Sequence, residues 1–238
     1  MRDFIKPILL SLPKWLREHL LPLLLTIRVG GLLIAAIALW AFYEIAEDIL
    51  EQESFVFDQQ ILLTLYNIQT PILNQIMLGI TFLGEPTFLF FVGAICVIWL
   101  LLQGKRSQAT TVIIAGGGAG ILNIWLKDLF GRSRPELWER IIDVQLKSFP
   151  SGHAMISMVV YSLLGYLLAT TFPRWSKLII IVTTILILGI GLSRLYLGVH
   201  WPTDVIAGYA AGTVWLIACV FSFELWRNRR INAEGNGQ

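Results

Sequence analysis

Six long stretches of this chain contain no charged side chain. They are Val29–Tyr43, Pro86–Gly104, Ser107–Leu126, Ala154–Pro173, Leu178–Ser193 and Val205–Phe223. A helix needs about 20 mostly apolar residues to cross the hydrocarbon core of a bilayer, and the shorter stretches reach that length by extending a turn into their flanks. Only 14% of the residues are charged and the mean hydropathy is +0.70, whereas about a quarter of the residues in soluble domains are charged. The sequence therefore predicts an all-α, polytopic membrane protein with six transmembrane helices.

A seventh uncharged stretch, Gln59–Gly84, is too polar for a span that faces lipid. It contains Gln59, Gln60, Asn67, Gln69, Asn74 and Gln75, and Pro71 interrupts it. Two short interfacial helices broken at Pro71 fit this composition better, with Gly84 and Pro86 marking the entry to the second span. The loop before this stretch is acidic, and its carboxylates, Asp58 included, are expected to form a solvated face.

The distribution of charge predicts the orientation in the membrane. With six spans and the N-terminus inside, twelve of the 18 Lys and Arg residues lie on the inner side, which agrees with the positive-inside rule. The expected organisation is a cytoplasmic amphipathic segment at 1–28, a six-helix domain at 29–226 and a cytoplasmic basic tail at 227–238, in the plasma (inner) membrane. A net charge of +2 is too small to indicate a nucleic-acid partner, and Cys96 and Cys219, both in apolar stretches, are interpreted as packing residues.

The other six basic residues lie on the predicted outer side, against that rule. They are Lys127, Arg132, Arg134, Arg140, Lys147 and Arg194. Gly131 allows the chain to leave the helix, and Pro135 keeps Arg134 out of the helical region, so Lys127 and Arg134 can reach one anion. Snorkelling at the interface is the alternative. The three basic residues at 132, 140 and 147 could hold a second phosphate, although solvated loop charges are the preferred interpretation.

Two further segments bring polar groups to the same side. Ser151-Gly152-His153 precedes the fourth span, where a helix N-terminus offers unpaired N–H groups, a hydroxyl and a glycine that lets a phosphate approach. An ordinary serine N-cap beside an incidental histidine is the alternative. His200 and Asp204 are neighbours on a helical turn, and an Asp on one ring nitrogen leaves the other free to attack. The alternative for this pair is a hydrogen bond that closes a helix start.

Together these residues resemble the three-part signature of the type 2 phosphatidate phosphatase superfamily. Every signature position is matched by Lys127…Arg134-Pro135, Pro150-Ser151-Gly152-His153 and Ser193-Arg194…His200…Asp204. The resemblance implies that His200 is the nucleophile that forms a phosphohistidine and that Asp204 orients it. It implies that His153 protonates the leaving alkoxide and then activates water. The phosphate-binding residues that it implies are Lys127, Arg134, Ser151, Gly152 and Arg194.

The resemblance implies an integral membrane lipid phosphatase whose site faces the periplasm or another extracytoplasmic space. The expected partners are the membrane and a lipid phosphate of the phosphatidate, phosphatidylglycerol phosphate or undecaprenyl diphosphate type. Three cations and a helix N-terminus can stabilise a phosphoryl group, so no metal or other cofactor is expected. Alternatives are a non-catalytic lipid-binding or transport protein, or the vanadate-dependent haloperoxidase activity found elsewhere in the superfamily. The sequence leaves open the choice between monophosphate and diphosphate, and the oligomeric state.

Overall fold

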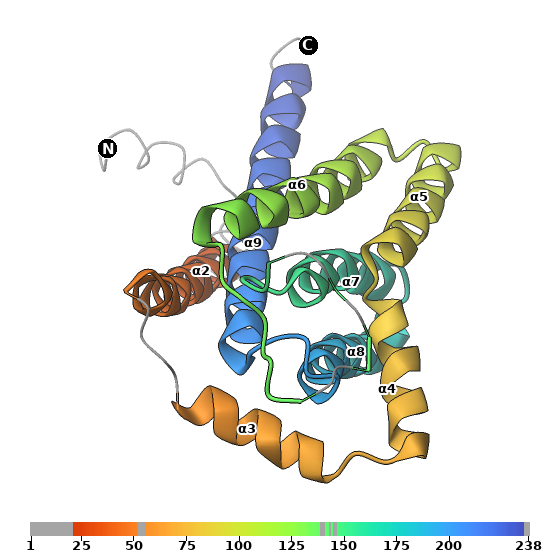
Figure 1. The fold of residues 1–238 in the computed structure, drawn as a ribbon. Coiled ribbons are helices and arrows are strands. Elements are labelled where there is room, and N and C mark those ends of the chain that lie inside the picture. The colour runs from red at the N-terminus through yellow and green to blue at the C-terminus, as the bar shows by residue number, and fades with distance from the viewer. Residues whose placement is uncertain (1–20, 52–55, 139–140, 143, 145–146, 236–238) are drawn as a thin grey trace. The chain divides into compact units, whose positions relative to one another are not determined.

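The computed structural model describes the backbone of residues 21–51, 56–138, 141–142, 144 and 147–235, and all its regular elements are helices. In chain order they are α2 (Leu21–Leu50), α3 (Val56–Asn67), α4 (Pro71–Leu83), α5 (Pro86–Leu102), α6 (Arg106–Phe130), α7 (Gly152–Thr171), the 3-10 helix η2 (Pro173–Trp175), α8 (Ser176–Tyr196) and α9 (Pro202–Gly235) (Figure 1). The predicted all-α class is therefore confirmed.

Five of these helices are long and apolar enough to cross a membrane, namely α2, α6, α7, α8 and α9. A sixth crossing is obtained when α4 and α5, which meet at a 47° bend, are counted as one broken span. Each of the six predicted stretches lies within or largely overlaps its own helix. The predicted break at Pro71 is also found, since α3 ends at Asn67 and α4 begins at Pro71.

The chain divides into two compact units, residues 1–37 and 38–238, and the boundary falls within α2. Of the first unit only the helical residues 21–37 are described. Residues 1–20, most of the predicted amphipathic segment, lie outside the described residues, so that segment remains a prediction. The site lies entirely within the second unit.

Local sequence signals fix the helix ends near the site. Thr70 caps α4, because its side-chain oxygen accepts a hydrogen bond from the Leu73 amide, and Pro71 follows at the first helical position. Gly131 ends α6 in the left-handed conformation, with φ at 61°, and its amide donates to the Lys127 carbonyl. The chain therefore turns sharply within four residues of Lys127, as the sequence predicted.

Helix α7 packs against α6, α8 and α9, and glycines set its distance from α9. A Cβ atom at Gly208 would lie 2.7 Å from the Ser151 carbonyl oxygen, and one at Gly212 would lie 2.8 Å from the Met155 carbonyl oxygen. Such close backbone contact is typical of packed membrane helices, which use small residues at their interfaces. The approach brings the first turns of α7 and α9 together, and the Ser151 amide donates to the Asp204 carbonyl over 3.0 Å.

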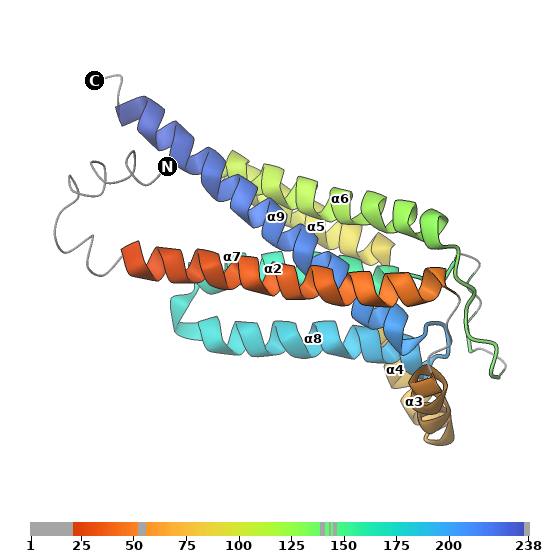
Figure 2. The ribbon, with the colours of Figure 1, turned by 90° about the vertical axis from the view of Figure 1, so that its left-hand side faces the viewer.

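The ends that carry the predicted site residues lie at one end of the second unit (Figure 2). They are the C-terminal ends of α6 and α8 and the N-terminal ends of α7 and α9. The loop that joins α6 to α7 is held there by a cluster of three aromatic rings from Phe42, Phe130 and Phe149, whose centroids are 4.9–6.2 Å apart. Phe149 is fully buried, and it anchors the chain directly before Pro150 and Ser151.

Candidate active site

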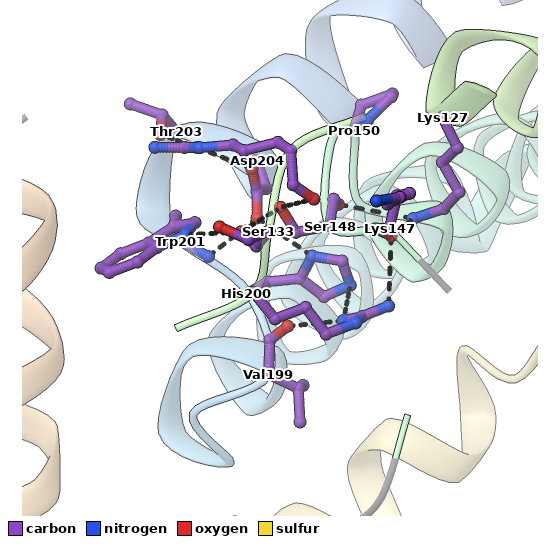
Figure 3. A network of polar contacts seen from close by, with 12 residues as sticks. Lys127, Ser133, Lys147, Ser148, Pro150, Val199, His200, Trp201, Thr203 and Asp204 are labelled. Atoms are coloured by element: carbon purple, nitrogen blue, oxygen red, sulfur yellow. Dashed lines mark hydrogen bonds and ion pairs between the residues drawn. The ribbon is translucent and has the colours of Figure 1, made fainter. Parts of the chain in front are cut away.

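A buried histidine–aspartate pair lies at the centre of this end. His200 belongs to the short loop between α8 and α9, and its Nδ1 is 3.2 Å from Asp204 Oδ2. The Trp201 amide donates to the same oxygen over 2.9 Å, so the carboxylate position is fixed by the start of α9. Both side chains are almost completely buried, and Figure 3 shows them beside each other. The second ring nitrogen, His200 Nε2, lies 3.2 Å from a guanidinium nitrogen of Arg134.

The surroundings of His200 favour a neutral ring. Burial lowers the pKa of His200 well below its usual 6.5, and the positive charges of Arg194, Arg134 and Lys127 lower it further. A neutral imidazole whose Nδ1 donates to a carboxylate has its lone pair on Nε2. The geometry therefore directs the lone pair of Nε2 toward Arg134, among the basic residues at this end.

Lys127 and Arg134 enclose the loop segment that leads into α7. Lys127 Nζ donates to the carbonyl oxygens of Lys147 and Ser148, and Arg134 donates to those of Lys147 and Val199. Both side chains are less than a tenth exposed. The snorkelling interpretation is therefore wrong for these two residues, because a snorkelling side chain extends its charge into water.

Arg194 and Ser151 have buried polar atoms without a hydrogen-bond partner among the described residues. Arg194 Nη1 donates to Thr81 Oγ1 over 2.8 Å, but its Nε makes no such bond. Ser151 occupies the N-cap position of α7, yet its side chain makes no capping bond and its Oγ is also unpartnered. The ordinary N-cap reading is therefore wrong. Buried polar groups are usually paired, so two unpaired donors at this end indicate a place for an acceptor.

His153 lies in the first turn of α7, and its Nε2 is 3.1 Å from Glu85 Oε2. Glu85 stands at the junction of α4 and α5, and about half of its side chain is exposed. The adjacent Gly84 allows this approach: a Cβ atom there would lie 2.3 Å from Ile190 and 3.3 Å from His153. Tyr161 also holds the junction, because its hydroxyl donates to the Leu83 carbonyl over 2.6 Å.

Gly152, the remaining predicted site residue, is required by packing against α6. A Cβ atom at this position would lie 2.8 Å from Asn123 Oδ1. Asn123 is buried, and its Nδ2 donates to the Pro150 carbonyl over 3.3 Å. The side chain of Asn123 thus positions the turn that carries Ser151 and Gly152. The structure brings all eight predicted site residues to one end of the unit, on four helix ends and the two loops between them.

Arg132 and Asp58 correct two expectations. The preferred interpretation of Arg132 from the sequence was a solvated loop charge. Its guanidinium instead pairs with Asp204 at 2.7 Å and with Asp58 at 3.1 Å. Asp58 was expected on a solvated acidic face, but it is 1% exposed. Both predictions were wrong because each side chain pairs with an opposite charge that lies far away in the sequence. Arg140 lies outside the described residues, and Lys147 has an exposed side chain.

Sequence reasoning missed four polar residues that support the site: Asp58, Thr81, Glu85 and Asn123. Thr81 and Asn123 stand within apolar stretches, where a polar side chain is a weak signal of a buried hydrogen bond. Glu85 stands at the N-cap position of α5, directly after a glycine, and an acidic residue at that place was a usable signal. In the part of the chain that the structure describes, no group of three His, Cys, Asp or Glu residues could hold a metal ion.

Comparison with known proteins assigns the family. Residues 108–228 match the PAP2 superfamily. The chain is 33% identical over 148 residues to phosphatidylglycerophosphatase B of Bacillus subtilis, and this match covers 61% of this chain and 72% of that protein. It is 42% identical over 66 residues to the undecaprenyl-diphosphatase of Sulfolobus acidocaldarius, covering 28% of this chain and 29% of that protein.

The fold agrees with this assignment. The crystal structure of a transmembrane PAP2 type phosphatidylglycerolphosphate phosphatase from Bacillus subtilis superposes with a TM-score of 0.73 at 28% identity, over 80% of this chain and 96% of that one. With apolar helices long enough to cross a membrane and relatives that are membrane lipid phosphatases, the chain is an integral membrane protein that belongs to the PAP2 superfamily of phosphatases.

Proposed function

We propose that this protein hydrolyses a lipid phosphate monoester or a polyprenyl diphosphate through a covalent phosphohistidine on His200. The observation that carries the proposal is the buried His200–Asp204 pair, in which Asp204 holds one ring nitrogen and the other, Nε2, lies 3.2 Å from an Arg134 donor. A nucleophile needs an adjacent group that fixes its tautomer and a nearby site for the group it attacks. His200 has both.

The reaction proceeds in two balanced steps. In the first, the lone pair of His200 Nε2 forms a bond to phosphorus, the bond from phosphorus to the lipid oxygen breaks, and His153 gives its proton to that oxygen. In the second, His153 takes a proton from water, the water oxygen bonds to phosphorus, and the bond to His200 breaks. The lipid alcohol and inorganic phosphate are released, and both histidines return to their starting state. For a diphosphate, the leaving group is the lipid monophosphate.

The charges around the site suit this chemistry. Phosphoryl transfer depends mainly on positioning and on stabilising negative charge on the equatorial oxygens. Arg134 and Arg194 offer planar guanidinium donors, and Lys127 offers a point charge. The unpartnered Ser151 Oγ and Arg194 Nε are assigned to the phosphoryl oxygens, as is the Gly152 amide at the start of α7. No step in this scheme requires a metal ion.

An apolar cavity beside the site accounts for a lipid leaving group. It has a volume of about 430 Å³, lies between α5, α6 and α7, and has Pro86, the neighbour of Glu85, in its lining. Because Glu85 contacts His153, we assign the lipid part of the leaving group to this side of the site. The proposal puts the headgroup at the helix ends and leaves the acyl or prenyl tail in the membrane.

The decisive experiment measures phosphate release by purified protein from a panel of lipids. The panel contains phosphatidylglycerol phosphate, phosphatidate and undecaprenyl diphosphate, because the relatives named above act on the first and last of these classes. Wild type should release phosphate from at least one, and His200→Ala should release none. With a labelled phosphoryl donor and an acid-free quench, wild type should accumulate labelled protein and His200→Ala should not. A protein that binds these lipids without releasing phosphate would be a transporter or lipid-binding protein instead.

A further inference from the structure

Arg132 lies between two buried carboxylates, those of Asp58 and Asp204. Its Nη1 donates to Asp204 Oδ1 and to Thr203 Oγ1, each over 2.7 Å, and its Nη2 donates to Asp58 Oδ2 over 3.1 Å. Its guanidinium carbon is 5.5 Å from the centroid of the Trp201 ring. The planar fork of an arginine can hold two carboxylates in this way, whereas the single nitrogen of a lysine cannot.

Asp58 ties the interfacial helix α3 to the start of α9. Its two carboxylate oxygens accept from the Thr203 amide over 3.0 Å and from the Thr203 hydroxyl over 2.6 Å. With the bond from Arg132, this carboxylate has three donors although it is only 1% exposed. An unpaired carboxylate would be costly at such burial, so Asp58, Thr203 and Arg132 form one connected unit.

The unit reaches the nucleophile through Asp204. One carboxylate oxygen of Asp204 faces His200 and the Trp201 amide, and the other faces Arg132. The fully buried Asp204 needs a nearby positive charge to remain ionised, and the ionised form is the stronger acceptor for the N–H at Nδ1 of His200. Arg132 supplies that charge from the side opposite to His200, and Asp58 fixes the position of Arg132.

We infer that Arg132 and Asp58 are positioning residues for the nucleophile, which hold Asp204 ionised and aligned on His200 through the chain Asp58–Arg132–Asp204–His200. The inference rests on the proposed function of His200. It assigns Arg132 to the support of the nucleophile, apart from the cations assigned to the phosphate. It also makes α3 a part of the active-site framework.

The central test is Arg132→Gln, which keeps a polar side chain but removes the charge and the fork. A hydrogen bond to a charged group is worth roughly a 10- to 100-fold change, so kcat is expected to fall about 100-fold. KM and the inhibition constant of orthovanadate, a phosphate analogue, should change by no more than about twofold. The fall in kcat should be the same for the lipid and for a nitrophenyl phosphate ester, because His200 attacks in both.

Two companion variants separate positioning from simple loss of structure. Arg132→Lys restores the charge without the fork and should recover about a tenth of wild-type kcat. Asp58→Asn keeps the shape of Asp58 but presents one acceptor oxygen in place of two, and should lower kcat about tenfold. The double variant Asp58→Asn/Arg132→Gln should lose little more than Arg132→Gln alone, because both changes break the same chain.

The matched controls are Glu44→Gln and Arg174→Gln, which remove exposed charges outside the site, and both should keep wild-type kcat. A folded Arg132→Gln protein with normal kcat would overturn the inference. So would a loss shared by KM and orthovanadate binding, since that result would make Arg132 a ligand of the phosphate. If Arg132→Gln does not fold, wild-type kcat in both Arg132→Lys and Asp58→Asn would overturn it equally.

Phosphoenzyme measurements on the wild-type protein and on these variants test the proposed function separately. Labelled phosphoenzyme in wild type, and none in His200→Ala, supports the nucleophile itself. Against that background, a normal rate of phosphoenzyme formation in Arg132→Gln overturns only the positioning role. An absence of phosphoenzyme and of phosphate release in wild type would instead overturn the proposed function.

Discussion

Each of the two histidines at the site contacts one carboxylate. The two pairs differ in how far apart the histidine and its carboxylate lie in the sequence. Asp204 lies four residues after His200, and this spacing predicts a contact on any helical turn. Glu85 lies 68 residues before His153, and no single-sequence pattern reports such a pair. The same holds for Arg132 and Asp58, which are 74 residues apart. The residues with local partners could therefore be predicted, and those with distant partners could not.

The lowered pKa of His200 predicts the pH dependence of turnover. If the neutral ring is the nucleophile, as proposed, kcat/KM should hold as the pH falls through 6.5 and decline only at the lower pKa of the folded protein. Arg194→Gln removes one of the charges that lower this pKa and should move the acid limb to higher pH. The substrate's own ionisation is common to both profiles, so their difference isolates His200. Superimposable acid limbs would contradict the assignment.

His153 and Glu85 give a second prediction at this scale. If His153 protonates the leaving oxygen, His153→Ala should slow lipid hydrolysis strongly, on the order of 100-fold. The same variant should still form phosphoenzyme from a nitrophenyl phosphate, whose leaving group needs little protonation. Glu85→Gln weakens the contact that holds His153 and should show the same dependence on the leaving group, to a smaller extent. Rates with both substrates provide the measurement, and equal losses on the two would remove His153 from the acid role.

Among the helices, the pairing of α7 with α9 is what places the two histidines together. The glycines at 208 and 212 allow the two backbones to touch, and the Ser151 amide then reaches the Asp204 carbonyl. The six predicted spans and the break at Pro71 follow from hydropathy and proline chemistry. The close contact between α7 and α9 does not, because a glycine in a membrane helix is common and its partner is not encoded nearby.

Gly208→Val should therefore separate the first turns of α7 and α9. The added side chain meets the Ser151 carbonyl, and overpacking of this kind costs about 1–3 kcal/mol. We expect a lower Tm in detergent and a loss of turnover with both lipid and nitrophenyl substrates. Gly79→Ala is the control, because nothing lies within 4 Å of its added Cβ and alanine favours helix more than glycine. Wild-type activity in Gly208→Val would show that the α7–α9 distance is not critical.

For the molecule as a whole, the charge distribution predicts that the site faces the outer side of the membrane. The prediction rests on the twelve Lys and Arg residues assigned to the inner side, and it places Glu136 outside and Arg174 inside. Both residues are exposed, and they lie in segments at opposite ends of α7. In a background without Cys96 and Cys219, Glu136→Cys should react with an impermeant thiol reagent on intact cells. Arg174→Cys should react only after permeabilisation, and the opposite pattern would place the site in the cytoplasm.

Three partners of the sequence motifs lie upstream of the segment that matches the family. That segment covers residues 108–228, whereas Asp58, Thr81 and Glu85 belong to α3, α4 and the α4–α5 junction. Grafting only the motif-bearing helices onto another scaffold would transfer the nucleophile and its cations but leave behind the groups that hold Arg132, Arg194 and His153. A working transplant of this chemistry would have to begin at Val56, the first residue of α3.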